Sequence, residues 1–151
     1  MKRFRFPLRP VAILRAHRET RAREAFATAV HAVAQAEDAL ARTRVRMRAL
    51  EAALFAGRQE RFHPAEAALL LADYRRECAR EIEAERLVIT AREEMQLRRT
   101  DYIEAHRELE IVERLEGKAR TAHRRENEKL EQAEADDFAG RRRLEPFATS
   151  Q

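Results

Sequence analysis

Residues 57–64, Gly-Arg-Gln-Glu-Arg-Phe-His-Pro, limit the fold most, because glycine and proline are otherwise almost absent from the interior of this chain. Glycine leaves a helix at little cost because it accepts left-handed backbone angles, whereas proline fits the first turn of a helix and disrupts its interior. We therefore expect Gly57 to end one long helix and Pro64 to begin another, with Glu66 in the first turn, where a carboxylate suits the helix dipole. The chain should fold back on itself at this hinge.

The composition favours helix along almost the whole chain. Charged residues make up 38% and aromatic residues 6% of the 151 residues, and alanine, glutamate, arginine and leucine, all strong helix formers, are abundant. No Val/Ile/Thr-rich run bounded by turns indicates a strand. The predicted fold class is all-α: two long helices form an antiparallel coiled-coil hairpin, and the second helix is longer than the first. We expect one coiled-coil rod over 1–151, with a basic N-terminal segment 1–9, a first helix 10–56, a hinge 57–63, a second helix 64–143 and a disordered tail 144–151.

Apolar residues in the first predicted helix alternate in spacing between three and four. Such a repeat makes two helices supercoil with the apolar seam facing a partner. Nearer the N-terminus the stripe weakens to Leu8, Val11, Leu14 and Ala22 between arginines, so we expect looser packing there. The strong part of the seam comprises Phe26, Ala29, Val33, Ala36, Leu40, Thr43, Met47, Leu50 and Leu54.

The second predicted helix carries a longer and less regular apolar pattern. At 1.5 Å per residue the two helices would be about 70 and 120 Å long, so the last stretch of the second should project past the first, from about Glu113 onward. Gly117 is the expected place for a kink, and Gly140 and Pro146 should end the helix. The apolar positions are Leu70, Tyr74, Cys78, Ile82, Val88, Met95, Tyr102, Ala105, Leu109, Val112, Ala119 and Leu130.

Charge is concentrated at the start of the chain. Residues 1–24 hold eight lysines and arginines but two acidic residues, against a net charge of +4 for the whole chain. The basic start is either a solvated helix face or a surface that docks onto an acidic protein or lipid, and Phe4 and Phe6 favour docking because aromatic residues among arginines are typical of interface anchors. The single cysteine, Cys78, fits a reducing compartment, and no apolar run reaches the roughly 20 residues that span a bilayer. We expect a cytoplasmic protein without direct membrane insertion.

No catalytic or metal-binding constellation is evident in the sequence. The five histidines are scattered, no two stand four residues apart, and no glycine-rich loop could hold a phosphate. We therefore expect no enzyme activity, no cofactor and no metal.

The two ends of the chain carry the motifs of a known family. The first match is Lys2-Arg3-Phe4-Arg5-Phe6-Pro7-Leu8, followed by Val11, Leu14 and Arg15. The second is Glu113-Arg114-Leu115, followed by Glu131-Gln132 and Asp136-Asp137-Phe138-Ala139. With these motifs in this order, the chain resembles the flagellar FliJ family over essentially its whole length. It departs from the family pattern in two places: Gly117 interrupts the distal helix, and Asp137 stands where glutamate is expected.

The resemblance implies a cytoplasmic, non-catalytic component of flagellar type III protein export, peripheral at the cytoplasmic face of the inner membrane. Members form an antiparallel two-helix coiled coil similar to the central stalk of rotary ATPases. The implied partners are the hexameric export ATPase, which this protein would bind and stimulate, the membrane export gate protein, and export chaperones. No nucleic acid is expected.

Two groups of residues are the candidate contacts under this interpretation. For the export gate they lie in the first turns of the second helix, although packing against Leu50 and Leu54 would also explain Tyr74 and Cys78. The gate candidates are Leu70, Tyr74, Cys78, Glu81 and Glu85. The candidates for ATPase binding, near the chain termini, are Arg3, Phe4, Phe6, Arg15, Arg124, Arg125 and Lys129.

Three other functions remain open at this point. The nearest is the homologous stalk protein of a virulence type III secretion injectisome. A nucleic-acid-binding protein would use the basic first 24 residues, and its affinity would fall steeply with salt. A coiled-coil spacer would instead assemble with itself in a concentration-dependent way and would have no effect on any ATPase.

Overall fold

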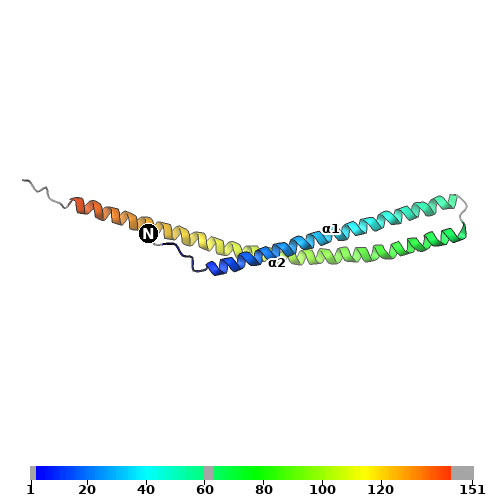
Figure 1. Cartoon of the computed structure of the whole chain (residues 1–151), viewed down its shortest axis with the longest axis horizontal. Helices are drawn as coiled ribbons and strands as arrows, with labels where there is room; N and C mark the ends of the chain where they lie inside the picture. The colour runs from blue at the N-terminus through cyan, green and yellow to red at the C-terminus, as the bar shows by residue number, and fades with distance from the viewer. Residues whose placement is uncertain (1–2, 60–62, 144–151) are drawn as a thin grey trace, which may run out of the picture. The chain divides into compact units, whose positions relative to one another are not determined.

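The computed structural model describes residues 3–59 and 63–143, and these form two helices and no strand. Helix α1 runs from Arg9 to Gln59 and helix α2 from Pro64 to Arg143, with 51 and 80 residues. The two helices pack against each other as an antiparallel hairpin (Figure 1). The predicted all-α hairpin with a longer second helix is therefore confirmed.

Both helices begin where proline allows them to. The N–H of Arg9 donates to the carbonyl of Phe6 over 3.2 Å, and Pro10 occupies the first turn of α1, where its missing N–H costs nothing. Pro64 opens α2, and the N–H of Glu66 donates to the carbonyl of His63 over 3.0 Å. Both starts agree with the sequence analysis.

Gly57 does not end α1 as we expected. The helix passes through it to Gln59, and no glycine among the described residues has a positive φ. A glycine inside a helix costs only about 1 kcal/mol relative to alanine, an amount that the packing of a long helix can offset. Helix α2 likewise continues through Gly117 and extends past Gly140 to Arg143. Residues 60–62 of the predicted hinge and the predicted tail 144–151 lie outside the described residues.

The chain divides into two compact units, which we describe separately. Unit 1 combines the two ends of the chain, Met1–Arg18 and His106–Gln151, and unit 2 is Glu19–Ala105. Unit 2 contains the whole of the strong predicted seam of α1. Every one of those nine residues is buried or half-buried, and Ala29 and Thr43 are the most buried of them. The three-four spacing thus predicted this seam correctly.

The α2 half of the seam in unit 2 was predicted only in part. The seam follows a three-four spacing that is interrupted only at the exposed Arg98, so Glu77, Glu81 and Ala84 face α1, and Ile82, which lies between these positions, is 52% exposed. The register set by the seam therefore outweighs the preference of one isoleucine for burial. The buried or half-buried residues at this spacing are Ala67, Leu70, Tyr74, Glu77, Glu81, Ala84, Val88, Ala91, Met95, Tyr102 and Ala105.

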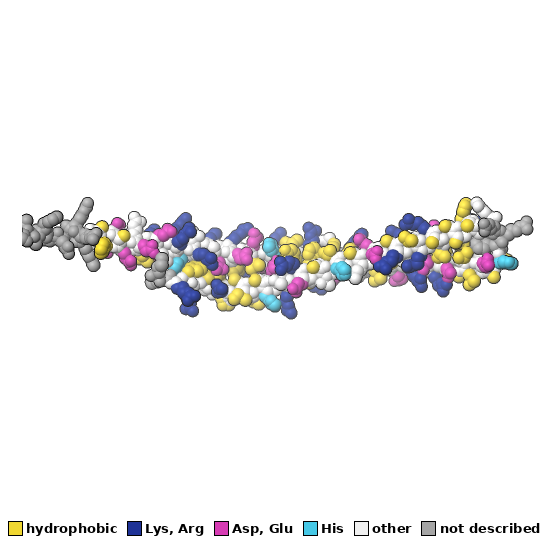
Figure 2. All heavy atoms as spheres, turned by 45° about the horizontal axis from the view of Figure 1, so that its top comes forward, with side chains coloured by type: hydrophobic (Ala, Val, Ile, Leu, Met, Phe, Trp, Pro, Cys, Tyr) yellow, Lys and Arg dark blue, Asp and Glu magenta, His cyan; other side chains and the backbone are white. Residues whose placement is uncertain are grey.

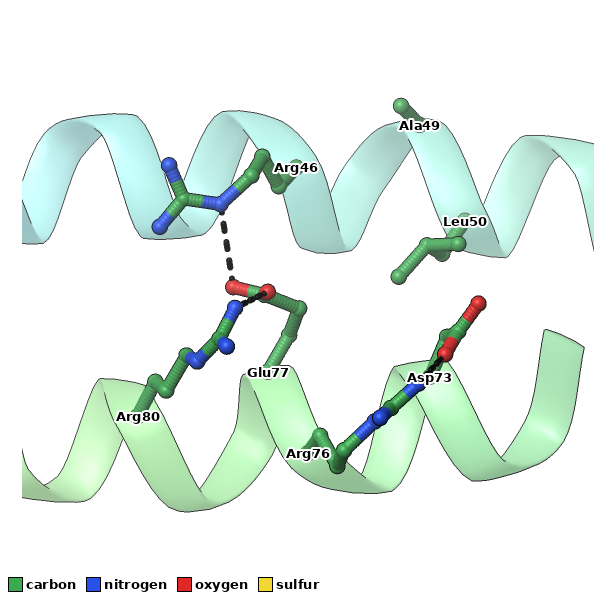
Figure 3. Close-up of a pocket in the computed structure, with 7 residues that line it drawn as sticks. All are labelled: Arg46, Ala49, Leu50, Asp73, Arg76, Glu77 and Arg80. Carbon is green, nitrogen blue, oxygen red and sulfur yellow. Dashed lines mark hydrogen bonds and ion pairs between the residues drawn. The ribbon is translucent and has the colours of Figure 1, made fainter.

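A polar network occupies the seam at Glu77, whose side chain is 8% exposed (Figure 3). One carboxylate oxygen accepts from Nε of Arg46 on α1 over 3.1 Å, and the other accepts from Arg80 on the same helix. Arg46 also donates to Oγ1 of Thr43, which in turn donates to the carbonyl of Ala39. These contacts satisfy the buried carboxylate, and a polar residue at a seam position selects one register of the two helices.

Aromatic and charged pairs flank the seam elsewhere in unit 2. The rings of Phe26 and Tyr102 are stacked across the two helices, with centroids 6.1 Å apart and planes inclined by 9°. On one side of the seam, Arg92 of α2 donates to the carboxylate of Glu37 over 2.6 Å. On an antiparallel pair such contacts fix which residues lie opposite one another.

In unit 1 the α2 half of the seam continues through the predicted residues Leu109, Val112 and Ala119, whereas the α1 half differs from the prediction. Val112 is only 2% exposed, and Arg15 of α1 donates from Nη1 to the carbonyl oxygen of Glu108 over 3.0 Å. Leu8, Val11 and Leu14, predicted to face α2, are exposed. Ala12, Arg15 and Ala16 are half-buried in their place. These three positions continue the heptad spacing of α1, and the guanidinium of Arg15 pairs with Glu108 at the edge of the seam. Leu8, Val11 and Leu14 therefore remain outside the seam.

The paired part of α2 also extends further than predicted. Pairing was expected to end near Glu113, but Glu116, Ala119, His123 and Asn127 are half-buried. The N-terminal segment covers α2 there, ahead of the first residue of α1. All residues from 128 to 140 are exposed, and we call this stretch the overhang. Leu130, predicted to be a seam residue, lies in the overhang and is 52% exposed because no first-helix residue lies opposite it.

Candidate functional site

The N-terminal segment of unit 1 lies against α2 through its aromatic residues. Arg3 and Arg5 are exposed, while Phe4 and Phe6 are half-buried, an alternation typical of extended backbone. The Phe4 ring meets the ring of His123 edge to face, with centroids 5.4 Å apart. The guanidinium carbon of Arg120 lies 5.8 Å from the centre of the Phe4 ring, within range of a cation–π contact. Phe4 therefore anchors the segment to α2.

A groove of about 800 Å³ opens beside this anchor. Four arginines and one glutamate supply its charged groups, so the groove is strongly cationic. Glu116 accepts a hydrogen bond from Nη2 of Arg120 over 3.1 Å, whereas Arg3, Arg5 and Arg9 form no ion pair with any described residue. We call this site the arginine groove; it is lined by Arg3, Phe4, Arg5, Phe6, Arg9, Glu116 and Arg120.

The arginine groove contains three of the seven candidates for ATPase binding, Arg3, Phe4 and Phe6. Arg15 is paired with Glu108 and does not line the groove. Arg124, Arg125 and Lys129 are exposed further along α2, and Arg124 pairs weakly with Glu128 at 3.7 Å. The groove therefore contains the candidates of the N-terminal segment but none of the basic candidates on α2.

Sequence reasoning missed three arginines of the groove, Arg5, Arg9 and Arg120. A signal for Arg120 was present, because counting both helices outward from the hinge places the N-terminal segment beside that part of α2. The alternation of arginine and phenylalanine indicated the same for Arg5, since every second side chain of an extended segment shares a face. Neither count indicates a cavity, which depends on side-chain conformation.

Unit 1 exposes an apolar surface in addition to the groove. Large apolar side chains from residues 8–14 and from the facing part of α2 remain outside the seam, each between 37% and 63% exposed. On the face shown in Figure 2, hydrophobic, basic and acidic side chains alternate over both helices. A two-helix pair buries only its seam, so such residues are available to partners. In this part of unit 1 they are Leu8, Val11, Ile13, Leu14, Ile111 and Leu115.

In unit 2, the candidate gate residues are engaged with α1. The hydroxyl of Tyr74 donates to Oε1 of Glu51 over 2.9 Å. This hydrogen bond and the charge of Glu51, with a smaller effect of Cys78, raise the pKa of Tyr74 to about 12. Cys78 is half-buried and has no disulfide partner. Tyr74 thus combines a seam position with a polar contact at the helix edge.

Arg44 of α1 connects the two acidic gate candidates. Its Nε donates to Glu81 over 2.8 Å and its Nη2 donates to Glu85 over 2.7 Å. These two hydrogen bonds raise the pKa of the Arg44 guanidinium above its ordinary value. The fifth candidate, Leu70, is half-buried, but its neighbours Leu69 and Leu71 are exposed, at 68% and 41%. Leu70 is therefore the seam residue of the apolar run 69–71, as predicted.

Within residues 3–59 and 63–143, no three His, Cys, Asp or Glu side chains are grouped so that they could hold a metal ion. In the same part of the chain, neither helix contains a stretch apolar enough to cross a membrane.

The fold assigns the chain to the antiparallel coiled-coil hairpin proteins, and the arginine groove and the overhang are surfaces on which such a protein could bind partners. The chain belongs to the flagellar FliJ family, because the family model for the flagellar FliJ protein matches residues 4–145. It is therefore a protein associated with flagellar export. Comparison with curated proteins gave no match, and comparison with solved structures gave none either.

Proposed function

We propose that this protein is the non-catalytic stalk of the flagellar export ATPase. In this proposal unit 1 binds and stimulates the ATPase ring, and unit 2 binds the membrane export gate protein. Export chaperones are the third class of partner. The protein would act at the cytoplasmic face of the inner membrane as a peripheral component.

The single observation that carries the proposal is the arginine groove. Three of its four arginines are exposed and form no ion pair with a described carboxylate, so their guanidinium groups are available to a partner. An acidic loop of a partner could supply the carboxylates, and arginine binds them through two parallel hydrogen bonds. The half-buried Phe4 and Phe6 would add aromatic contact area at the centre of such an interface.

The experiment is a titration of the export ATPase of the same organism with the full-length chain. The test variant is Arg3→Glu/Arg5→Glu/Arg9→Glu, which reverses the charge of the groove. The matched control is Arg21→Glu/Arg23→Glu/Arg99→Glu, which makes the same change of net charge at exposed positions of unit 2. We expect the native chain and the control to stimulate ATP hydrolysis, and the groove variant to need at least about tenfold more protein for the same effect.

Circular dichroism of all three proteins verifies that the helices persist. Equal stimulation by the groove variant and the native chain would refute the ATPase contact through this groove. Absence of stimulation by the native chain would refute the stalk function altogether.

A separate experiment tests the gate contact. Tyr74→Ala should weaken binding of the soluble part of the export gate protein, measured by titration calorimetry, while the helical signal is retained. A variant that loses helicity together with binding would show that Tyr74 holds the hairpin and would remove it from the interface.

A further inference from the structure

One face of α2 in unit 1 carries a regular series of residues. Their spacing alternates between three and four from Gly117 to Phe138, so all of them lie along one stripe of the helix. Along this stripe the residue types follow an order: a glycine, two arginines, an asparagine, two glutamates and a phenylalanine. The stripe consists of Gly117, Arg120, Arg124, Asn127, Glu131, Glu134 and Phe138.

This order is complementary to itself when reversed. If a second copy of α2 lies antiparallel with its Asn127 opposite the first Asn127, Arg124 faces Glu131 of the second copy. In the same register Arg120 faces Glu134, and Gly117 faces Phe138. A two-fold axis repeats each of these contacts, which is the property of a closed, isologous interface.

The shape of the surface fits the outermost pair. A side-chain carbon added at Gly117 would meet no atom within 4 Å, and a shallow cavity of about 250 Å³ lies there between Glu113, Glu116 and Arg120. Phe138, the proposed occupant, is 65% exposed in the overhang. A phenyl ring seated over a glycine can approach the helix backbone closely and buries its own apolar surface there.

The charges on the stripe are available for exchange. The side chains of Arg120 and Arg124 are 69% and 73% exposed, and their carboxylate partners, Glu116 and Glu128, are one turn away on the same helix. The guanidinium of Arg120 also lies 5.8 Å from the centre of the Phe4 ring, and it can keep this contact while it pairs with a second copy. Such exposed intrahelical pairs contribute little, so they can be replaced by contacts to a second copy. The arginine groove, which includes Arg120, adds cationic groups beside the place where the acidic overhang of the second copy would lie.

We propose that this stripe is a homodimer interface, in which the overhang of each copy binds the glycine and arginines of the other. The pairs are Gly117 with Phe138, Arg120 with Glu134, and Arg124 with Glu131, arranged about Asn127. The interface requires only this chain, but it shares Arg120 with the arginine groove, so the dimer and the ATPase contact compete for that side chain.

Sedimentation equilibrium of the full chain, from micromolar to millimolar concentration at low and high salt, tests the dimer. We expect a reversible dimer that high salt weakens, because the contacts are exposed ion pairs. Arg120→Glu/Arg124→Glu and Glu131→Arg/Glu134→Arg should each weaken self-association by about tenfold or more, since each places like charges opposite one another. A native chain that stays monomeric throughout would overturn the proposal.

Mixing the two variants is the decisive arm. Every glutamate of one then faces an arginine of the other, so an equimolar mixture should form a heterodimer at least as readily as the native chain dimerises. The matched control Arg125→Glu/Lys129→Glu changes net charge equally off the stripe and should dimerise like the native chain. A control that dissociates as readily as the stripe variants, or a mixture that stays monomeric while both variants retain their helical circular dichroism, would refute the pairing.

Discussion

Replacement of Phe26 and Tyr102 by leucine, singly and together, measures how much their stacking stabilises unit 2. The two rings are nearly parallel, and their centroids, 6.1 Å apart, lie near the far end of the range for aromatic pairs. Such pairs contribute about 0.5–1.5 kcal/mol beyond the area they bury, so the longer separation points to the lower half, about 0.5–1 kcal/mol. The cycle isolates this coupling because burial and helix propensity of each single change cancel.

The assay is urea unfolding followed by circular dichroism for the native chain, Phe26→Leu, Tyr102→Leu and the double variant. A second cycle pairs Phe26→Leu with Phe55→Leu. Phe55 is exposed, and at 1.5 Å per residue it lies about 44 Å further along α1. This cycle should give a coupling within about 0.3–0.5 kcal/mol of zero. A coupling between Phe26 and Tyr102 that is no larger than this control would refute the stacking argument.

Three further predictions concern single side chains. In a Tyr102→Phe background, absorbance titration of tyrosinate should give Tyr74 a pKa near 12, and Glu51→Gln should move this pKa toward 10.0; an unchanged pKa in Glu51→Gln would contradict the assigned cause. Because Tyr74 keeps its proton to higher pH in the folded state than in the unfolded state, the contribution of this contact to stability should be lost as pH rises from 10 to 12. The hydrogen bond from Arg46, with that from Arg80, holds the pKa of Glu77 below its ordinary value of 4.5, so near that pH the unfolded state binds more protons than the folded state. In acid unfolding experiments the stability of the native chain should therefore fall below about pH 4.5, and more steeply than the stability of Glu77→Gln. Gly117→Ala should raise the thermal stability of α2 by about 0.5–1 kcal/mol in circular dichroism, since the added methyl group meets no neighbour, and a destabilised variant would show that the glycine is needed for the fold.

The sequence predicted the hairpin because its causes are local. Pro64 fits the first turn of a helix but not its interior, and the three-four spacing from Phe26 to Leu54 favours a partner helix of the same kind. Errors arose where the apolar pattern and the heptad register disagree. Leu14 and Ile82 are apolar but off the seam, whereas Glu77 is charged and on it, and only the partners of Glu77 on the other helix explain why it can be buried there.

The candidate site was predictable only as far as spacing allows. The basic and aromatic N-terminal segment was recognised from sequence, and three of its residues do line the arginine groove. Arg120, more than 100 residues away in the chain, belongs to the same groove because α2 continues past the start of α1 and the Phe4 ring packs on it. Side-chain contacts of this kind depend on the exact overlap of the two helices, and an error of a few residues at the hinge changes it.

The buried Glu77 also determines how unit 2 responds to force. Sliding α1 along α2 by one heptad, about 10 Å, would bring each seam residue opposite another seam position and would cost little if every position were apolar. The same movement would carry Glu77 away from Arg46 and leave a carboxylate in the seam without its partner on the other helix. Unit 2 therefore resists shear along its axis, and a pull on one of its helices is passed to the other at a fixed register.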